Sequence, residues 1–204
     1  MLYSIFHFIF YIIAKLFFNL KVYGLNNIPK RGAALIFANH VSFLDPPVVG
    51  TAITNRQIYY LARDTLFKNF FISFILKSWN GIPMNRGVGF RGGFEKALEV
   101  LKKGNVLLAF PEGTRSIDGK IQNGKVGIGM LVYRAKVPVI PCYIDGTFKV
   151  LPRGAKFIKF NRISVRFGSP LDFSEMYKLS ESKEVYQVIV EKIMESIRKL
   201  SMEV

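Results

Sequence analysis

The stretch "AALIFANHVSFLDPP", residues 33–47, combines an apolar run with an imidazole and a carboxylate. Its first six residues, 33–38, are apolar throughout, as is typical of a strand covered on both faces of a sheet. His40 follows shortly after this run, and Asp45 comes five positions later, before a Pro-Pro pair. Functional groups of open α/β sheets commonly lie just beyond the carboxyl ends of strands. The stretch therefore predicts an inner strand with an active site at its end.

The rest of the chain repeats this alternation of strand and helix. β-rich runs recur at residues 57–62, 105–110, 137–144 and 162–168. Helical patterns occupy residues 94–104, 124–136 and 184–200. The last of them gathers valines and isoleucines on one face: Val185, Val188, Ile189, Ile193 and Ile197. We therefore expect the α/β class: a single domain with a mixed, mostly parallel β-sheet covered by helices.

The composition narrows the possible partners. The chain has 204 residues, a formal net charge of +15, 50% hydrophobic residues and 19 phenylalanines. This charge attracts nucleic acid, anionic lipid or acidic protein. Residues 1–94 hold ten basic and two acidic residues together with the longest apolar stretches. A chain that is both basic and apolar favours a membrane surface, and we expect no nucleic acid partner.

Residues 1–22 are expected to form a membrane-anchoring helical segment, and residues 23–204 the α/β domain. Residues 1–20 are nearly all apolar, and as a helix they would be about 30 Å long. A weakly polar stripe, which includes His7 and Lys15, favours a helix lying in the membrane interface over a spanning one. A buried core helix is a further alternative. Residues 65–79 are a second candidate for the interface, or else an amphipathic helix packed on the sheet.

The pair His40 and Asp45 fits general-base catalysis. Pro46 disfavours a helical backbone at Asp45, so a tight turn is expected to fold the carboxylate back onto the imidazole. A carboxylate on one ring nitrogen fixes the tautomer and leaves the other nitrogen free to accept a proton. The structural alternative is a histidine satisfied by backbone and an aspartate that caps the following helix.

Residues 110–116, "FPEGTRS", also follow an apolar strand and should emerge at a comparable edge of the sheet. Gly113 allows a close backbone approach to a ligand, and Arg115 offers a fork of donors to phosphate or carboxylate. Upstream, residues 81–86 end in a second cation, Arg86. Together these residues indicate a base beside a phosphate-binding site, although residues 110–116 alone could be a surface turn.

Four blocks, in order, give the chain a resemblance to a known family: "NHVSFLD", "GIPMNR", "FPEGTRS" and "VPVIPCYI". In them the chain resembles the glycerolipid acyltransferases that include the 1-acylglycerol-3-phosphate acyltransferases. The blocks span residues 39–144, about half of the chain.

The resemblance implies transfer of a fatty acyl group from a thioester to the sn-2 hydroxyl of lysophosphatidic acid, which gives phosphatidic acid. It makes His40 the base and Asp45 its orienter, without an acyl-enzyme, and makes the fourth block part of an acyl site. It assigns the acceptor's phosphate to six residues: Arg86, Glu112, Gly113, Thr114, Arg115 and Lys125. The expected partners are membrane lipids and an acyl donor on acyl carrier protein or coenzyme A, at the cytoplasmic face of the cell membrane. No metal or bound cofactor is expected.

Other functions remain open at this stage. Ser42, two residues after His40, raises the alternative of a lipid-directed serine hydrolase, although the chain has no G-x-S-x-G sequence. The acceptor could also be another lysophospholipid, and a basic binding module without catalysis would explain the charge alone. Residues 87–92 match G-x-G-x-x-G formally, but the polar run before them argues against a nucleotide site. Cys142, the only cysteine, is expected to be buried.

Overall fold

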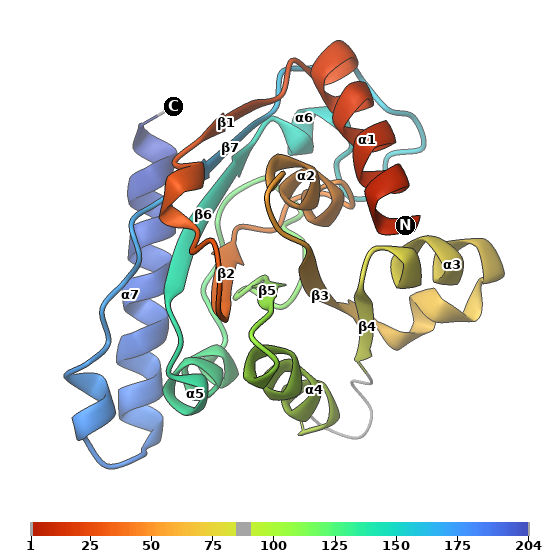
Figure 1. Cartoon of the computed structure of the whole chain (residues 1–204). Coiled ribbons are helices and arrows are strands. Elements are labelled where there is room, and N and C mark those ends of the chain that lie inside the picture. The colour runs from red at the N-terminus through yellow and green to blue at the C-terminus, as the bar shows by residue number, and fades with distance from the viewer. Residues whose placement is uncertain (1, 85–90, 204) are drawn as a thin grey trace.

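The computed structural model describes residues 2–84 and 91–203. Seven strands form one sheet in the order β1-β7-β6-β2-β5-β3-β4 (Figure 1). They are β1 (Lys21–Tyr23), β2 (Ala34–Ala38), β3 (Ile58–Arg63), β4 (Gly81–Met84), β5 (Val106–Ala109), β6 (Val139–Asp145) and β7 (Ser164–Phe167). Neighbouring strands are parallel except for β6 and β7, which are antiparallel. The expected mixed, mostly parallel sheet is confirmed.

Helices connect the strands and cover the sheet. The α-helices are α1 (Leu2–Phe18), α2 (Asp45–Ala52), α3 (Phe70–Ser78), α4 (Arg91–Lys102), α5 (Val126–Ala135), α6 (Thr147–Val150) and α7 (Lys183–Met202). Short 3-10 turns are η1 (Leu25–Asn27), η2 (Asp64–Lys68) and η3 (Met176–Lys178). Each β-rich run found in the sequence overlaps a strand, and each of the three helical patterns overlaps a helix.

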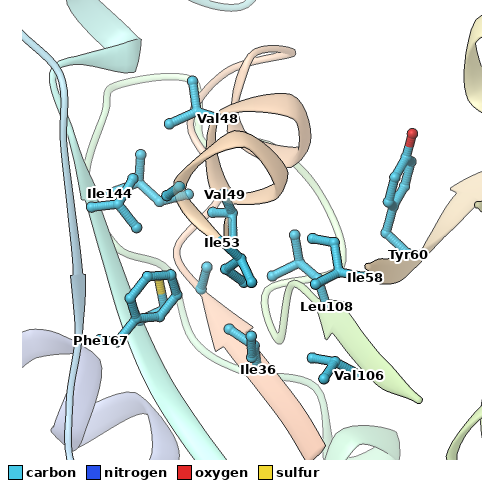
Figure 2. Packing of buried hydrophobic residues seen from close by; sticks show 14 of the residues in the cluster. Ile36, Val48, Val49, Ile53, Ile58, Tyr60, Val106, Leu108, Ile144 and Phe167 are labelled. Carbon is cyan, nitrogen blue, oxygen red and sulfur yellow. The ribbon is translucent and has the colours of Figure 1, made fainter. Parts of the chain in front are cut away.

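The core has two halves, one on each face of the sheet. On one face, Ile36 and Leu108 pack with Val49 of α2 and with Ile53, which directly follows this helix (Figure 2). On the other face, residues of β2 and β5 pack with α4, α5 and α7. All five residues of β2 are buried, which explains why this strand has no polar position. In α7 the predicted apolar face is buried except for Val188, which is 47% exposed.

Helix α1 packs on α2 and α3, and the side that faces the core includes Phe6, Phe10 and Ala14. His7 Nε2 lies 3.1 Å from the carbonyl oxygen of Ile53, and the Phe10 and Trp79 rings are 4.5 Å apart. The opposite side carries exposed apolar residues: Ile5, Phe8, Ile9, Ile12, Ile13, Leu16 and Phe17. A helix on a surface that faces water would instead expose mainly polar and charged residues on this side.

Exposed apolar residues are also found on α3, next to α1. Helix α3 has no buried residue among those described and exposes Phe70, Phe71 and Phe74. Leu20, by contrast, is fully buried, and β1 pairs with β7 in the sheet, so the chain joins the domain directly after α1. Over the described ranges, no helix combines the length and the apolar character needed to cross a membrane.

Candidate active site

Four parallel strands end at one edge of the sheet, and the candidate residues follow them. His40 comes after β2, residues 110–116 come after β5, Arg63 ends β3, and Thr147 comes shortly after β6. Because parallel strands place their carboxyl ends at the same edge, these loops meet there although they are far apart in the sequence. The edge is therefore where the candidate site is assembled.

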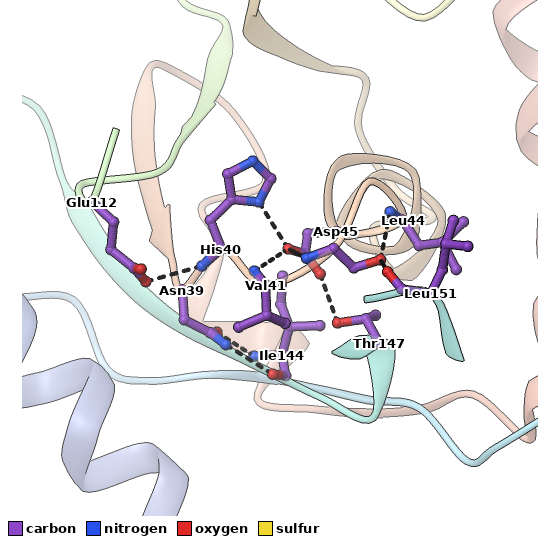
Figure 3. Close-up of polar contacts among 10 residues, drawn as sticks. Asn39, His40, Val41, Leu44, Asp45, Glu112, Ile144, Thr147 and Leu151 are labelled. Carbon is purple, nitrogen blue, oxygen red and sulfur yellow. Dashed lines mark hydrogen bonds and ion pairs between the residues drawn. The ribbon is translucent and has the colours of Figure 1, made fainter. Parts of the chain in front are cut away.

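The Asp45 carboxylate is fully buried and accepts four hydrogen bonds (Figure 3). Its Oδ2 lies 2.8 Å from His40 Nδ1 and 2.7 Å from the backbone nitrogens of both Val41 and Ser42. Its Oδ1 accepts from the Thr147 hydroxyl at 2.6 Å. A carboxylate without its proton only accepts, so Nδ1 carries the proton in this bond. The expected return of the carboxylate onto the imidazole is confirmed.

The backbone at Asp45 differs from the expectation, because this residue begins α2 instead of lying in a non-helical turn. The preference against a helical residue before proline is modest, and the four hydrogen bonds to the carboxylate outweigh it. Proline is also well tolerated in the first turn of a helix, where its missing N–H has no partner to lose.

The His40 side chain is fixed on its other sides as well. Its ring stacks on Phe110, with the ring centres 4.0 Å apart, and its carbonyl oxygen accepts from the Ser116 N–H at 2.8 Å. The side chain is 17% exposed. Among residues 2–84 and 91–203, no hydrogen-bond partner occupies Nε2. The ring therefore presents a nitrogen lone pair at the edge of a cavity.

The Glu112 side chain lies fully buried beneath this loop. Its Oε1 accepts a hydrogen bond of 3.0 Å from the backbone N–H of His40. Burial raises the pKa of Glu112 to about 7, against the lowering effect of backbone hydrogen bonds from His40 and Gln122. Glu112 is not among the residues that line the cavity. Its carboxylate therefore contacts the backbone that carries the histidine instead of the space where a phosphate would bind.

A cavity of about 690 Å³ opens beside His40, a size common for ligand sites. Its polar end, near the histidine, is lined by Arg63, Thr114, Arg115, Lys125 and Arg153. The remainder is lined mostly by apolar side chains, which include Phe10, Leu66, Leu76, Trp79, Ala97 and Ile128. The cavity lining thus combines a group of cations near the histidine with a larger apolar part.

Arg115 is the central cation of the polar end. Its guanidinium lies over the Phe43 ring, 3.4 Å from the ring centre, which holds its plane in place. Burial lowers the pKa of Arg115, and the nearby cations Arg153 and Arg63 lower it further. Its Nη1 is buried and finds no acceptor in the described part of the chain. Several cations around a buried donor without an acceptor are suited to bind an anion, whose oxygens would accept the missing hydrogen bond.

The residues expected at the phosphate separate into three groups. Thr114, Arg115 and Lys125 line the polar end, and Gly113 joins them. Gly113 has φ of 71°, a value that favours glycine, but its N–H donates to the Phe110 carbonyl, so this N–H is not part of an anion-binding nest. Glu112 lies beneath the loop, as described above, and Arg86 lies outside the described residues, as do most of residues 87–92.

Three contributors were missed by the reading of the sequence. Arg63 and Arg153 line the polar end, and Thr147 holds Asp45. Arg63 and Thr147 do carry a signal, since each lies at or just after the end of a strand of the sheet. Arg153 carries no such signal, because it lies in an irregular segment after α6 and not at the end of a strand.

One alternative, the serine hydrolase, loses support in the structure. The Ser42 side chain is buried and its hydroxyl donates to the Leu151 carbonyl at 2.7 Å, so it is not directed at the imidazole as a hydrolase nucleophile would be. Cys142 is buried as expected, and burial raises the pKa of its thiol. The fourth block forms β6, and none of residues 137–144 lines the cavity, contrary to the expected part in an acyl site.

Comparisons with known proteins agree with this arrangement. Residues 19–145 match the family model described as Acyltransferase. The chain is 28% identical over 181 residues to a 1-acyl-sn-glycerol-3-phosphate acyltransferase of Bacillus subtilis, covering 88% of this chain and 87% of that one. It is 30% identical over 159 residues to a chloroplastic 1-acyl-sn-glycerol-3-phosphate acyltransferase of Brassica napus, covering 72% and 45%.

The fold also matches a solved structure. The crystal structure of the 1-acyl-sn-glycerophosphate (LPA) acyltransferase from Thermotoga maritima superposes with a TM-score of 0.79 and 27% sequence identity. The match covers 98% of this chain and 79% of that one. The resemblance found in the four sequence blocks is thereby confirmed. The chain belongs to the acyltransferase family.

Proposed function

We propose that this protein transfers a fatty acyl group from an acyl thioester to the sn-2 hydroxyl of 1-acylglycerol-3-phosphate, forming phosphatidic acid. The observation that carries the proposal is the cavity beside His40, whose Nε2 has no hydrogen-bond partner among the described residues and whose lining combines several cations with a larger apolar part. An acceptor with a phosphate, a reacting hydroxyl and an acyl chain fits this combination of groups. The names of the relatives support the same acceptor.

In the proposed mechanism, the acceptor hydroxyl attacks the carbonyl carbon of the thioester while His40 Nε2 takes its proton. The new C–O bond gives a tetrahedral oxyanion, and the imidazolium is stabilised by the Asp45 carboxylate. When the oxyanion collapses, the C–S bond breaks and the imidazolium returns the proton to the leaving thiolate. One histidine both accepts the proton of the hydroxyl and returns it to the thiolate. The proposed reaction therefore needs neither an acyl-enzyme nor a metal or bound cofactor.

The other residues of the site receive roles from their positions. Arg115 and Lys125, with Gly113 and Thr114 beside them, bind the phosphate. The family resemblance assigns Arg86, which lies outside the described residues, to the same group. The apolar part of the cavity holds an acyl chain. We assign Glu112 a positioning role: it holds the His40 backbone N–H and so sets the height of the imidazole over the cavity.

The acyl donor is a thioester of acyl carrier protein or of coenzyme A. Both donors carry negative charge, which the net charge of +15 attracts. We place the enzyme at the cytoplasmic face of the cell membrane, where such donors are found. Helix α1, the core of the proposed anchoring segment 1–22, supports this placement by turning its apolar side outward, as an interfacial helix does.

The test is an acyl-transfer assay in detergent micelles with lysophosphatidic acid and a radiolabelled acyl thioester, carrier protein and coenzyme A forms being compared. Wild type should form phosphatidic acid, and His40→Ala should lose about 10² to 10⁴ in rate. His7→Ala is the matched control, because it removes the other histidine, which binds the Ile53 carbonyl away from the cavity. Release of free fatty acid instead of transfer would favour the hydrolase. Faster transfer to another lysophospholipid would refute the assigned acceptor.

A further inference from the structure

Residues 151–162, between α6 and β7, form a segment here named the basic loop, to which the proposed reaction assigns no role, although its Arg153 lines the polar end of the cavity. Residues 153–160 of it are exposed throughout. Three large apolar side chains stand out into solvent: Phe157 is 80% exposed, Ile158 54% and Phe160 73%. Two neighbouring exposed phenylalanines on one loop form an unusual surface for a water-facing segment.

The charge of this segment is one-sided. The basic loop holds four cations and no carboxylate: Arg153, Lys156, Lys159 and Arg162. In the described ranges none of the four forms an ion pair. The nearest acidic residues in sequence are Asp145 and Asp172, well outside the loop. Unpaired cations interleaved with exposed aromatic rings are typical of a surface that binds anionic lipid headgroups while its rings enter the interface.

The backbone holds this loop in a defined position. Pro152 forms a β-bridge with Ser42, which lies between β2 and α2 next to His40. The Lys159 N–H donates to the Val150 carbonyl at 2.9 Å. At the far end, the Ile163 N–H donates to the carbonyl of Phe18 at 2.9 Å. The exposed rings are therefore presented by a fixed segment and not by a free end.

The same loop is continuous with the outward side of α1 (Figure 1). The Phe160 ring stacks on Phe17, with centres 5.8 Å apart, and on Phe18 at 6.1 Å. Phe17 and Leu16 are exposed members of the apolar side of α1. At its other end the loop contributes Arg153 to the polar end of the cavity. It thus runs from the proposed membrane helix to the mouth of the site.

We propose that the basic loop is a separate binding surface for anionic phospholipid headgroups, with Phe157 and Phe160 inserted into the interface. This rests on the proposed membrane association of α1 and adds to it a headgroup-selective contact. Lys156 and Lys159 attract the anionic surface, and the loop fixes the mouth of the cavity against the lipid from which the acceptor arrives. An acidic carrier protein is the rival occupant, but it gives no reason for the rings to be continuous with α1.

The test is co-flotation of the full chain with vesicles of phosphatidylcholine alone or of an equal mixture of phosphatidylcholine and phosphatidylglycerol. Lys156→Gln/Lys159→Gln should weaken binding to the anionic vesicles about 25-fold, at about fivefold for each cation, and leave the neutral vesicles little changed. Phe157→Ala should weaken binding to both vesicles at least about fivefold. Transfer to lysophosphatidic acid in detergent micelles should stay unchanged in all variants.

Matched controls lie elsewhere on the surface. Lys102→Gln/Lys103→Gln makes the same charge change at the end of α4, on the other face of the sheet, and Met202→Ala removes an exposed apolar side chain at the end of α7. Neither control should affect flotation.

The failures can be told apart. If wild type floats with neither vesicle, the membrane placement itself is wrong and the loop inference falls with it. If wild type floats and the loop variants float equally well, only the loop inference is overturned. If Lys156→Gln/Lys159→Gln keeps vesicle binding but raises the KM for the carrier-protein thioester and not for the coenzyme A thioester, the loop binds the carrier protein instead, which also overturns the inference.

Discussion

Replacing Asp45 with asparagine tests the His-Asp pair with the smallest change of shape. Three donors converge on Oδ2, from His40 Nδ1 and two backbone nitrogens, while Oδ1 meets one hydroxyl, that of Thr147. The amide oxygen of asparagine must take the Oδ2 position, because an NH₂ group there would face three donors. The amide nitrogen then faces the Thr147 hydroxyl, which can turn to accept.

The expected loss follows from this orientation. The imidazole keeps its partner and tautomer, but the bond to Nδ1 no longer involves a charged acceptor. Hydrogen bonds to charged groups contribute about 1.5–3 kcal/mol, against about 1 kcal/mol for neutral ones. The imidazolium that forms during transfer therefore loses about 0.5–2 kcal/mol of stabilisation, so kcat should fall about 2- to 30-fold.

The assay is steady-state transfer to lysophosphatidic acid, combined with thermal unfolding of each variant. Asp45→Asn should stay folded, and Thr147→Val, which removes only the donor to Oδ1, should lose less than about tenfold in kcat. A kcat of Asp45→Asn within twofold of wild type would refute the stabilising role of the carboxylate. A loss beyond about 10⁴ in a folded protein would show that the tautomer had changed, contrary to the orientation worked out above.

Three further predictions concern Glu112, Arg115 and the contact between α5 and α7. Because the pKa of Glu112 is raised to about 7 in the fold from an ordinary 4.5, its stabilising effect is present below about pH 4.5 and is lost as the pH rises through 7. In urea unfolding, the Glu112 contribution should lower the free energy of unfolding of wild type by about 3 kcal/mol between pH 4.5 and pH 7. Glu112→Gln should lack this pH-dependent loss, and an equal loss in both proteins would contradict the prediction. Arg115→Lys keeps the charge but loses the stacking on Phe43 and the fork of donors, so the KM for lysophosphatidic acid should rise about tenfold with kcat nearly unchanged. Gly129→Ala would place a Cβ 2.1 Å from the Tyr186 carbonyl oxygen between α5 and α7, and should cost about 2 kcal/mol or more in thermal unfolding; an unchanged melting temperature would refute this close contact.

The sequence alone indicated the fold class and the pair at its centre. The apolar runs were long enough and regular enough to mark the inner strands, since buried parallel strands tolerate no polar position. His40 and Asp45 lie close in sequence, so a local turn could be expected to join them, and the carboxylate does fold back onto the ring. The starts of helices were less predictable. The Pro-Pro pair argued against a helix at Asp45, yet α2 begins there, because the first turn of a helix accepts proline without loss of a hydrogen bond.

Only the tertiary structure decided how the surroundings of the histidine are built. Thr147 reaches Asp45 across 102 positions, and Glu112 reaches the His40 backbone across 72. Arg153 comes from a segment without any periodic pattern. Local sequence indicates whether a segment forms a strand or a helix, because the periodicity of its apolar residues can be read within the segment itself. Contacts between loops at the strand ends depend on the order of the strands in the sheet, which no short stretch of sequence encodes.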